Sequence, residues 1–250
     1  KEKSAFATRE RQMTVEKSTV EEIRQRFDSE VEIFSTLETG QAAAIDSPLA
    51  MSLVAEAAAA TTPHAQSILD VGCGAGNYTL KLLERMPNLH VTLVDLSQAM
   101  LDRAVQRVRP QTTGKLEAFQ ADIRELELGQ RRFDIILASA VLHHLRAEAE
   151  WRSVFQKLHD ALKPRGSLWI FDIVESTIPE VQAIHWRRYG EYLTQLQDET
   201  FRDEMLARIT LEDTPRSVPF QLDLLRAVGF SDVEILHKNS CYAAFGAVKR

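Results

Sequence analysis

The chain has little cysteine and no long hydrophobic run. Its 250 residues include only two cysteines, Cys73 and Cys241, which lie far apart. Such thiols suggest neither a disulfide framework nor a metal cluster, and they fit a reducing compartment, so we predict a cytoplasmic protein. No apolar run approaches the roughly 18–20 residues that cross a bilayer, so no membrane-spanning helix is expected. The polar start, Lys1-Glu2-Lys3, lacks the apolar core of a signal peptide.

An excess of basic charge is also lacking. The chain has 30 Lys and Arg against 36 Asp and Glu, which gives a net charge of −6. This balance argues against a strong nonspecific surface for nucleic acid or anionic membrane, although it leaves room for a local basic patch. We therefore expect a small-molecule substrate, with tRNA or protein as open alternatives. The length fits one large α/β domain with an appendage.

Short apolar runs alternate with helical patterns after Ser67. Five runs are typical of buried parallel strands: residues 67–71, 90–95, 116–120, 133–138 and 167–173. Helical patterns lie between them at residues 78–86, 98–108 and 149–162. Two more strands are expected near the C-terminus, at 233–237 and 242–248, after a helix at 218–228. The alternation predicts right-handed crossovers and a doubly wound, Rossmann-like sheet.

Two further segments are expected to be helical. Residues 1–60 predict an N-terminal helical lid on a binding domain at 61–250, with a frayed start (1–12), a break at Gly40 and a second helix capped by Ser47. Residues 176–217 predict a helical insertion in that domain, with one long helix at 180–211. Their aromatic side chains would line a lid or, more simply, pack together, and the two segments are candidates for a homodimer interface.

A glycine loop follows the first predicted strand. The strand ends near Asp70, and the spacing Gly72-x-Gly74-x-Gly76 leaves almost no side-chain bulk where a ligand would touch the backbone. The spacing differs from G-x-G-x-x-G, in which the helix N-terminus receives a pyrophosphate. Asp70 would repel a diphosphate, but it would suit a cationic amino-acid group. The loop therefore favours S-adenosylmethionine over NAD.

Acidic residues follow the next two predicted strands. Asp95 lies 19 residues after Gly76, close to the spacing of an acid that binds ribose hydroxyls. The alternative is a cap on the following helix. Asp122 follows the third strand, where its carboxylate would accept a hydrogen bond from an exocyclic amine while Ile123 packs on a flat base. The alternative is a loop Asp that caps a turn. Because these acids occur together with the glycine loop, nucleoside binding is the favoured interpretation.

The fourth predicted strand leads to a pair of histidines. Ala138 and Ser139 are expected beside the methionine portion of the cofactor, since the carboxyl ends of parallel strands form the ligand crevice. His143 and His144 follow within one turn, and either is a candidate base or substrate-orienting group. Adjacent histidines with no evident third ligand are a poor metal pair, so no metal is predicted. The other candidate bases lie in the insertion and are His185 and Tyr189.

Five motifs occur in one order: LDVGCGAGNYT, VTLVDLSQAM, QADI, FDIILASAVLHHL and LKPRGSLWI. Together they resemble the core of the class I S-adenosylmethionine-dependent methyltransferases. The resemblance implies a seven-stranded sheet whose last strand is reversed. It also implies that Asp95 binds the ribose and that Asp122 and Ile123 bind the adenine, with Leu96 beneath it. The methionine portion would contact Asp70 and the loop residues Gly72, Cys73 and Gly74.

The flanks bear a second resemblance, carried by residues 26–34 (RFDSEVEIF) and by the order of the helical segments near Met205 and Gly229. They are similar to carboxy-S-adenosylmethionine synthases, once described as tRNA uridine methyltransferases, in which an arginine such as Arg202 or Arg208 would bind a carboxylate. Methyl transfer to a small molecule is the leading prediction. The alternatives are carboxy-type transfer, tRNA modification, an NAD(P)-dependent oxidoreductase and a non-catalytic cofactor-binding protein.

Overall fold

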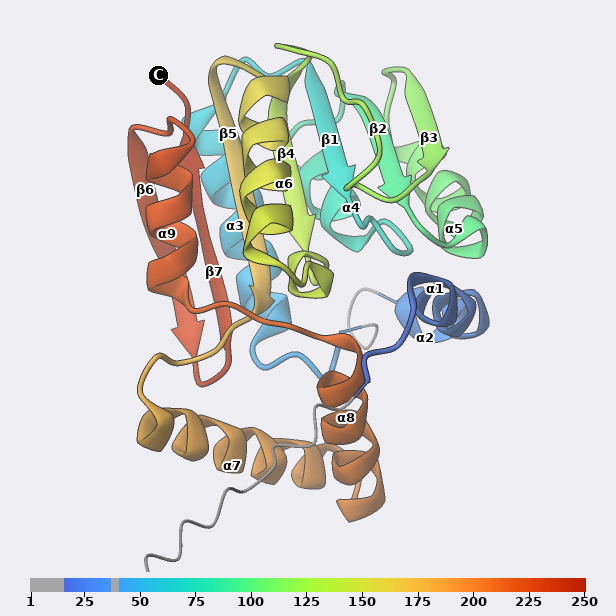
Figure 1. The fold of residues 1–250 in the computed structure, drawn as a ribbon. Helices are drawn as coiled ribbons and strands as arrows, with labels where there is room; N and C mark the ends of the chain where they lie inside the picture. The colour runs from blue at the N-terminus through green and yellow to red at the C-terminus, as the bar shows by residue number, and fades with distance from the viewer. Residues whose placement is uncertain (1–15, 37–40) are drawn as a thin grey trace, which may run out of the picture.

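The structure is a computed structural model that describes residues 16–36 and 41–250 (Figure 1). The expected frayed start at residues 1–12 and the break at Gly40 lie outside the described residues. The described part has one sheet between two layers of helices, with further helices beyond one end of the strands. No described helix is both long enough and apolar enough to cross a membrane.

Seven strands form the sheet in the order β3-β2-β1-β4-β5-β7-β6. Their bounds are β1 Ser67–Val71, β2 His90–Asp95, β3 Leu116–Gln120, β4 Phe133–Ser139, β5 Leu162–Ile173, β6 Asp232–Asn239 and β7 Tyr242–Val248. The last strand, β7, runs antiparallel to both β5 and β6. The other paired strands are parallel to their neighbours. This topology confirms the predicted fold class, including the reversed last strand.

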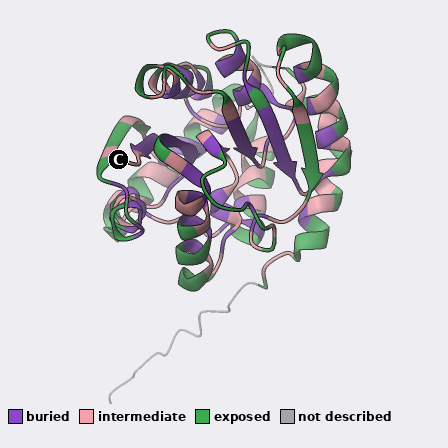
Figure 2. Cartoon of the chain, turned by 90° about the horizontal axis from the view of Figure 1, so that it is seen from above, coloured by how far each residue is buried: buried purple, intermediate pink, exposed green. Residues whose placement is uncertain are grey.

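Helices cover both faces of the sheet. One face packs against α3 (Ser47–Thr61), α4 (Asn77–Leu83) and α5 (Gln98–Val108), and the other against α6 (Glu148–Ala161) and α9 (Val218–Ala227). Short 3-10 turns, η1 (Arg109–Gln111) and η2 (Leu142–His144), follow α5 and β4. Figure 2 shows the strands mostly buried between these layers. The central strands β1, β2, β4 and β7 are buried along most of their length, so their sequences are largely continuous apolar runs. The edge strands β3 and β6 are exposed or half-buried and contain more polar residues.

Four helices lie beyond the carboxyl ends of the parallel strands (Figure 1): α1 (Val20–Ser29), α2 (Val31–Phe34), α7 (Pro179–Leu196) and α8 (Glu199–Glu212). The prediction of one long helix at 180–211 is wrong, because Asp198 starts a new helix by accepting a hydrogen bond from the amide of Phe201 at 2.8 Å. The predicted cap of α3 is also wrong by one residue. Asp46 is the N-cap, and Ser47 is the first helical residue.

Two other boundaries differ from the prediction. The turn expected at residues 163–166 lies within β5, where the register shifts and Arg165 adopts a positive φ of 66°. In addition, α3 packs on the sheet through its apolar face, so the segments of the first 60 residues that lie at the strand ends are α1 and α2.

The order in which the strands follow one another along the chain reverses between β1 and β4. Open α/β sheets bind ligands in the crevice outside the carboxyl ends of the strands at such a reversal.

Candidate active site

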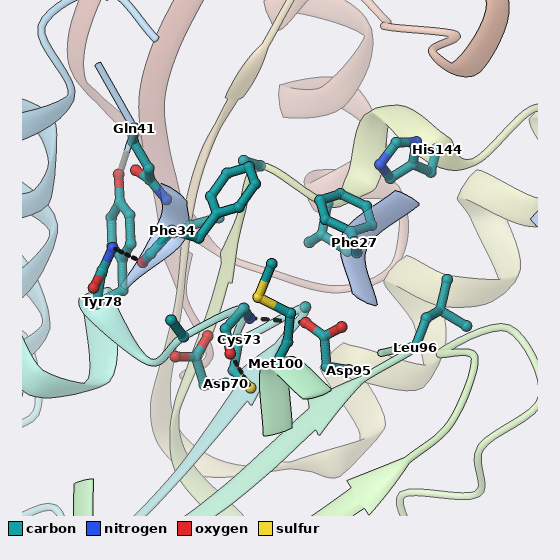
Figure 3. Close-up of a pocket in the computed structure, with 17 residues that line it drawn as sticks. Phe27, Phe34, Gln41, Asp70, Cys73, Tyr78, Asp95, Leu96, Met100 and His144 are labelled. Carbon is teal, nitrogen blue, oxygen red and sulfur yellow. Dashed lines mark hydrogen bonds between the residues drawn. The ribbon is translucent and has the colours of Figure 1, made fainter. Parts of the chain in front are cut away.

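The turn between β1 and α4 forms the floor of a cavity, here called the loop cavity, which Asp70, Gly72, Gly74, Asp95 and Ser139 help to line (Figure 3). Gly72 and Gly74 have positive φ angles of 64° and 49°, a conformation that glycine adopts without steric cost. A Cβ built on Gly74 would meet nothing within 4 Å. The backbone of the turn is therefore open to a ligand at this position.

Asp70 lies at the inner end of the loop cavity and is only 1% exposed. Its Oδ2 accepts a hydrogen bond from Thr79 Oγ1 at 2.6 Å. Burial raises the pKa of Asp70 to about 7, and the nearby charge of Asp95 adds to the increase. A buried carboxylate without a cationic partner is costly, so this position would favour a ligand that brings a positive charge.

Asp95 organises two backbone segments at the end of β2. Its Oδ2 accepts a hydrogen bond from the amide of Gly74 at 2.8 Å, and its Oδ1 accepts one from the amide of Ser97 at 2.9 Å. Burial raises the pKa of this carboxyl group, although these amide bonds oppose the increase. Each oxygen keeps a lone pair, so Asp95 has the capacity to accept hydrogen bonds from a pair of hydroxyl groups as well.

A second cavity continues past Asp95 toward the end of β3. This edge cavity is lined by Leu96, Asp122 and Ile123, and it shares Gly72 and Asp95 with the loop cavity. Burial would raise the pKa of Asp122, but hydrogen bonds from Arg124 outweigh it and lower the pKa. The carboxylates of Asp70, Asp95 and Asp122 therefore lie along one continuous crevice.

Helices α1 and α2 lie over this crevice. Phe27 and Phe34 line the loop cavity opposite Asp70 and Asp95 (Figure 3). An ion pair between Arg103 on α5 and Glu32, together with hydrogen bonds, holds these helices to the sheet domain. Ser97 Oγ donates to Asp28 Oδ1 at 2.5 Å, and Asn77 Nδ2 donates to the carbonyl oxygen of Phe34 at 3.2 Å. The loop cavity is thus closed on one side by residues from the N-terminal segment.

A larger cavity of about 770 Å³ lies between α1, α2 and α8. It meets the loop cavity at a common wall made by Phe27, Phe34, Gln41, Ala140 and His144. Its volume is within the range of about 300–1,000 Å³ that is typical of small-molecule sites. The crevice and the large cavity therefore form two adjoining compartments.

His143 and His144 lie where the compartments meet. The ring Nδ1 of His143 contacts the carboxylate of Asp172, and its backbone amide donates to the other oxygen of that carboxylate at 3.1 Å. Burial alone would lower the pKa of His143, but the charges of Asp172 and Asp213 raise it to about 9. Burial and the neighbouring His143 lower the pKa of His144 well below its usual value.

Paired charges stabilise the wall of the large cavity. Arg26 makes hydrogen bonds from Nε to both carboxylate oxygens of Glu212, at 2.8 and 3.1 Å, and from Nη1 to Glu30 at 2.8 Å. Arg208 also lines this cavity and lies 3.2 Å from Glu30. Arg202, the other arginine considered for a carboxylate, pairs with Asp203 on a different part of the surface. Of the two, the structure brings only Arg208 to the large cavity.

Three predicted site residues do not reach the cavities described here. Ala138 is fully buried in the core, because neighbouring strand residues point to opposite faces and Ser139 is the one that lines the loop cavity. Tyr189 is also fully buried, and its hydroxyl lies 3.3 Å from that of Tyr242. His185 lies against Ser176, with its Nδ1 2.9 Å from the Ser176 hydroxyl oxygen. These positions do not support a catalytic role for Tyr189 or His185.

Two carboxylates at the histidine pair were not predicted. Asp172 lies near the end of β5, and Asp213 directly follows α8. The sequence does contain a signal for Asp172: it is an acidic residue inside the apolar run of β5, and a buried carboxylate requires a partner. Asp213 carries no such signal, since an acidic residue just after a helix is usually exposed to solvent. Only the fold brings it to the histidines.

Comparison with known proteins identifies the domain that carries the crevice. Residues 68–166 match a family model described as a methyltransferase domain. These residues form a methyltransferase domain, which confirms over this part of the chain the predicted resemblance to the class I S-adenosylmethionine-dependent methyltransferases.

The relatives of the methyltransferase domain are named for different methyl acceptors. The chain is 30% identical over 119 residues to a malonyl-[acyl-carrier protein] O-methyltransferase of Priestia megaterium, covering 48% of this chain and 41% of that one. It is 25% identical over 190 residues to a demethylmenaquinone methyltransferase of Listeria monocytogenes, covering 74% and 78% of the two chains. The chain spans about half or less of the length of the first curated relatives that it matches.

Solved structures share the fold at lower identity. A 1,6-didemethyltoxoflavin-N1-methyltransferase from Burkholderia thailandensis has a TM-score of 0.61 at 19% identity, covering 91% of this chain and 87% of that one. Human N-acetylserotonin methyltransferase, solved with S-adenosylmethionine, has a TM-score of 0.58 at 19% identity, covering 91% and 57%. At these identities the likeness shows a common fold.

The crevice fits the cofactor of this domain class. S-adenosylmethionine has an amino group for a buried carboxylate such as Asp70, ribose hydroxyls for Asp95 and an adenine amine for Asp122. The open Cβ direction of Gly74 leaves room for a ligand that lies against the backbone. The donors and acceptors of the site therefore match the parts of this cofactor in the order in which they are joined.

The affinity for S-adenosylmethionine is expected to fall in acid. Between pH 7 and 5 the free protein takes up a proton on Asp70, whose pKa is about 7, and a bound ammonium group would have to displace it. The dissociation constant should therefore rise by up to about tenfold per pH unit below pH 7. Calorimetric titrations at several pH values measure this dependence.

The control is Asp70→Asn, which cannot titrate at this position. Asp95 is also buried with a raised pKa, and it remains in the variant. The two proteins are compared by the slope of the logarithm of the dissociation constant against pH. The difference between their slopes is then the contribution of Asp70 to the pH dependence. Equal slopes for both proteins would show that Asp70 does not bind the ammonium group.

Proposed function

We propose that this chain transfers the methyl group of S-adenosylmethionine to a small molecule bound in the large cavity. The main support for this proposal is the common wall of the loop cavity and the large cavity, to which Phe27, Phe34 and His144 contribute. A cofactor in the loop cavity would have its sulfonium end near this wall. An acceptor in the large cavity would approach it from the other side.

The residues of the crevice would hold the cofactor part by part. Asp70, Cys73 and the turn at Gly72 and Gly74 would contact the methionine portion, and Ser139 would flank it. Asp95 would accept hydrogen bonds from the ribose hydroxyls. Asp122 would accept one from the adenine amine, with Ile123 and Leu96 packed on the ring. The support for these proposed roles is that the residues line the loop cavity and the edge cavity.

The bound cofactor supplies a methyl group that is already activated on sulfur, so the protein has to align the acceptor and exclude water. Alignment of this kind contributes up to about 7–11 kcal/mol to lowering a barrier. The aromatic rings of Phe27 and Phe34 would exclude water from the sulfonium end. His143 and His144, which also line the large cavity, would contact the acceptor.

A small acceptor is favoured over a macromolecule. The large cavity has the volume of a small-molecule site and is enclosed by helices from both appended segments. Demethylmenaquinone and 1,6-didemethyltoxoflavin, the compounds in the names of two similar proteins, each contain a fused ring and are not macromolecules. Apolar side chains of the large cavity, among them Ile173, Phe201 and Met205, would suit a ring of this kind.

The test is methyl transfer from isotope-labelled S-adenosylmethionine to a panel of small acceptors that offer phenol, carboxylate or ring-nitrogen nucleophiles. Formation of S-adenosylhomocysteine together with a labelled product supports the proposal. Mass spectrometry of any ligand that copurifies with the chain distinguishes carboxy-type transfer, because the carboxylated cofactor is heavier. Cofactor binding without transfer to any class of acceptor would argue instead for a non-catalytic protein.

A further inference from the structure

Two histidines and a carboxylate converge at the boundary of the two compartments. His143 Nε2 lies 3.6 Å from Asp213 Oδ1, and His144 Nδ1 lies 3.4 Å from the same oxygen. All three ligand atoms lie within 4.8 Å of one another. Two atoms that bind one ion at about 2.0–2.2 Å in tetrahedral geometry are about 3.4 Å apart. The spacing of the three atoms is therefore that of metal ligands around a common centre.

A fourth residue orients one of these ligands from outside. The carboxylate of Asp172 contacts Nδ1 of His143 and accepts hydrogen bonds from the amides of His143 and Ile173, at 3.1 and 2.8 Å. These contacts fix the ring of His143 so that Nε2 faces Asp213. A carboxylate on the far nitrogen of a metal-bound histidine is a common outer contact, since it sets the tautomer and increases ligand basicity.

His144 adds an independent observation. Both ring nitrogens of this side chain are buried, and neither makes a hydrogen bond of normal geometry to a described residue, although Nδ1 lies 3.4 Å from Asp213 Oδ1 and the backbone of Glu212 is also close to the ring. A buried polar nitrogen without a partner is costly, so its presence indicates that something binds there. His144 lines the loop cavity and the large cavity, so one side of the cluster is open to a ligand.

We propose that His143, His144 and Asp213 bind one divalent transition-metal ion, with Asp172 as the residue that positions His143. Two imidazoles and one carboxylate favour zinc, iron(II) or manganese over calcium or magnesium, which prefer oxygen ligands alone. This revises the expectation that the adjacent histidines lack a third ligand, because the fold brings that ligand from the end of α8.

The role of the ion, unlike its binding, rests on the proposed function. An acceptor hydroxyl at the open position would lose its proton to solvent more readily, because the ion stabilises the oxygen anion. That oxygen would form the new bond to the methyl carbon, and the electron pair of the broken S–CH₃ bond would stay on sulfur. The acceptor hydroxyl thus loses one proton to solvent, and the sulfonium loses its positive charge when the methyl group leaves. No oxidant or reductant is needed.

The test is a titration of the chelator-treated, tag-free chain with Co²⁺, which reports tetrahedral or five-coordinate binding by visible absorption and does not require turnover. We expect one ion per chain in the wild type. Asp213→Asn and His144→Ala should each raise the dissociation constant by at least about tenfold, and Asp172→Asn by about 10- to 100-fold. His64→Ala, which removes an exposed histidine distant in sequence from His143 and His144, is the matched control and should bind Co²⁺ as the wild type does.

Three results would overturn the metal site: no saturable Co²⁺ binding by the wild type, binding equal in the wild type and both ligand variants, or more than one weak site that His64→Ala also removes. Circular dichroism confirms that each variant is folded, and the wild-type titration decides the question even if a variant does not fold. Binding of S-adenosylmethionine is measured in the presence of chelator. Its persistence without Co²⁺ binding would reject the metal site and leave the proposed function intact.

Discussion

Replacing Asp95 with alanine is expected to raise the dissociation constant of S-adenosylmethionine about a hundredfold. The carboxylate holds the amides of Gly74 and Ser97 at 2.8 and 2.9 Å, and it would also accept from the ribose hydroxyls. A hydrogen bond to a charged group contributes about 1.5–3 kcal/mol, and about 2.7 kcal/mol corresponds to a factor of one hundred. Isothermal titration calorimetry measures the change directly.

Two controls separate ribose binding from support of the loop. Asp102→Ala removes an exposed carboxylate from α5, the helix that follows Asp95, and should leave the affinity unchanged. The second control uses the 2′-deoxy analogue of S-adenosylhomocysteine. The wild type should bind it more weakly than the natural nucleoside, whereas Asp95→Ala should bind both equally. If the variant still discriminated between the two ligands, Asp95 would not contact the ribose.

Gly72→Ala is expected to lower the free energy of unfolding by about 2–4 kcal/mol. A Cβ at this position would lie 2.5 Å from Cγ2 and 2.6 Å from Cβ of Val141, and the residue has a φ of 64°. The left-handed backbone costs about 1 kcal/mol or more for alanine, and overpacking adds about 1–3 kcal/mol. Chemical denaturation of the ligand-free chain measures the loss.

Gly74→Ala is the matched variant two residues further on. Its φ is also positive, at 49°, but a Cβ there meets nothing within 4 Å. We expect a loss of only about 1 kcal/mol in the free energy of unfolding, together with a clear loss of affinity for S-adenosylmethionine because the methyl group would occupy ligand space. Equal stability losses in the two variants would show that the contact with Val141 does not restrict the loop.

Much of the sheet was predictable because its central strands are short, largely apolar runs. The bounds of β1, β2 and β3 were predicted to the residue, whereas β5 begins five residues earlier than expected. The early start could not be predicted, since Lys163, Pro164 and Arg165 are typical of a turn. Local sequence cannot reveal that Leu162 pairs with Phe133 ahead of the register shift, which extends β5 across this turn.

The crevice was more predictable than the large cavity. Asp70 and Asp95 lie at the carboxyl ends of β1 and β2, and Asp122 lies just after β3. Parallel strands end at one edge, so the convergence of these residues follows from the topology. The large cavity depends on helices from distant parts of the chain. Arg26 and Glu212 are 186 residues apart and pair only because α1 and α8 meet. Neither residue differs in sequence context from an ordinary solvated charge, so no local pattern could have indicated their contact.

The position of α1 and α2 has a consequence for the order of events. The same two helices wall the loop cavity and the large cavity. They are tied to α5 by Ser97 and Asp28 and to α8 by Arg26 and Glu212. A movement of this roof would therefore open the nucleoside crevice and the neighbouring compartment to water together. Exchange of the nucleoside by this route would expose the acceptor compartment at the same time.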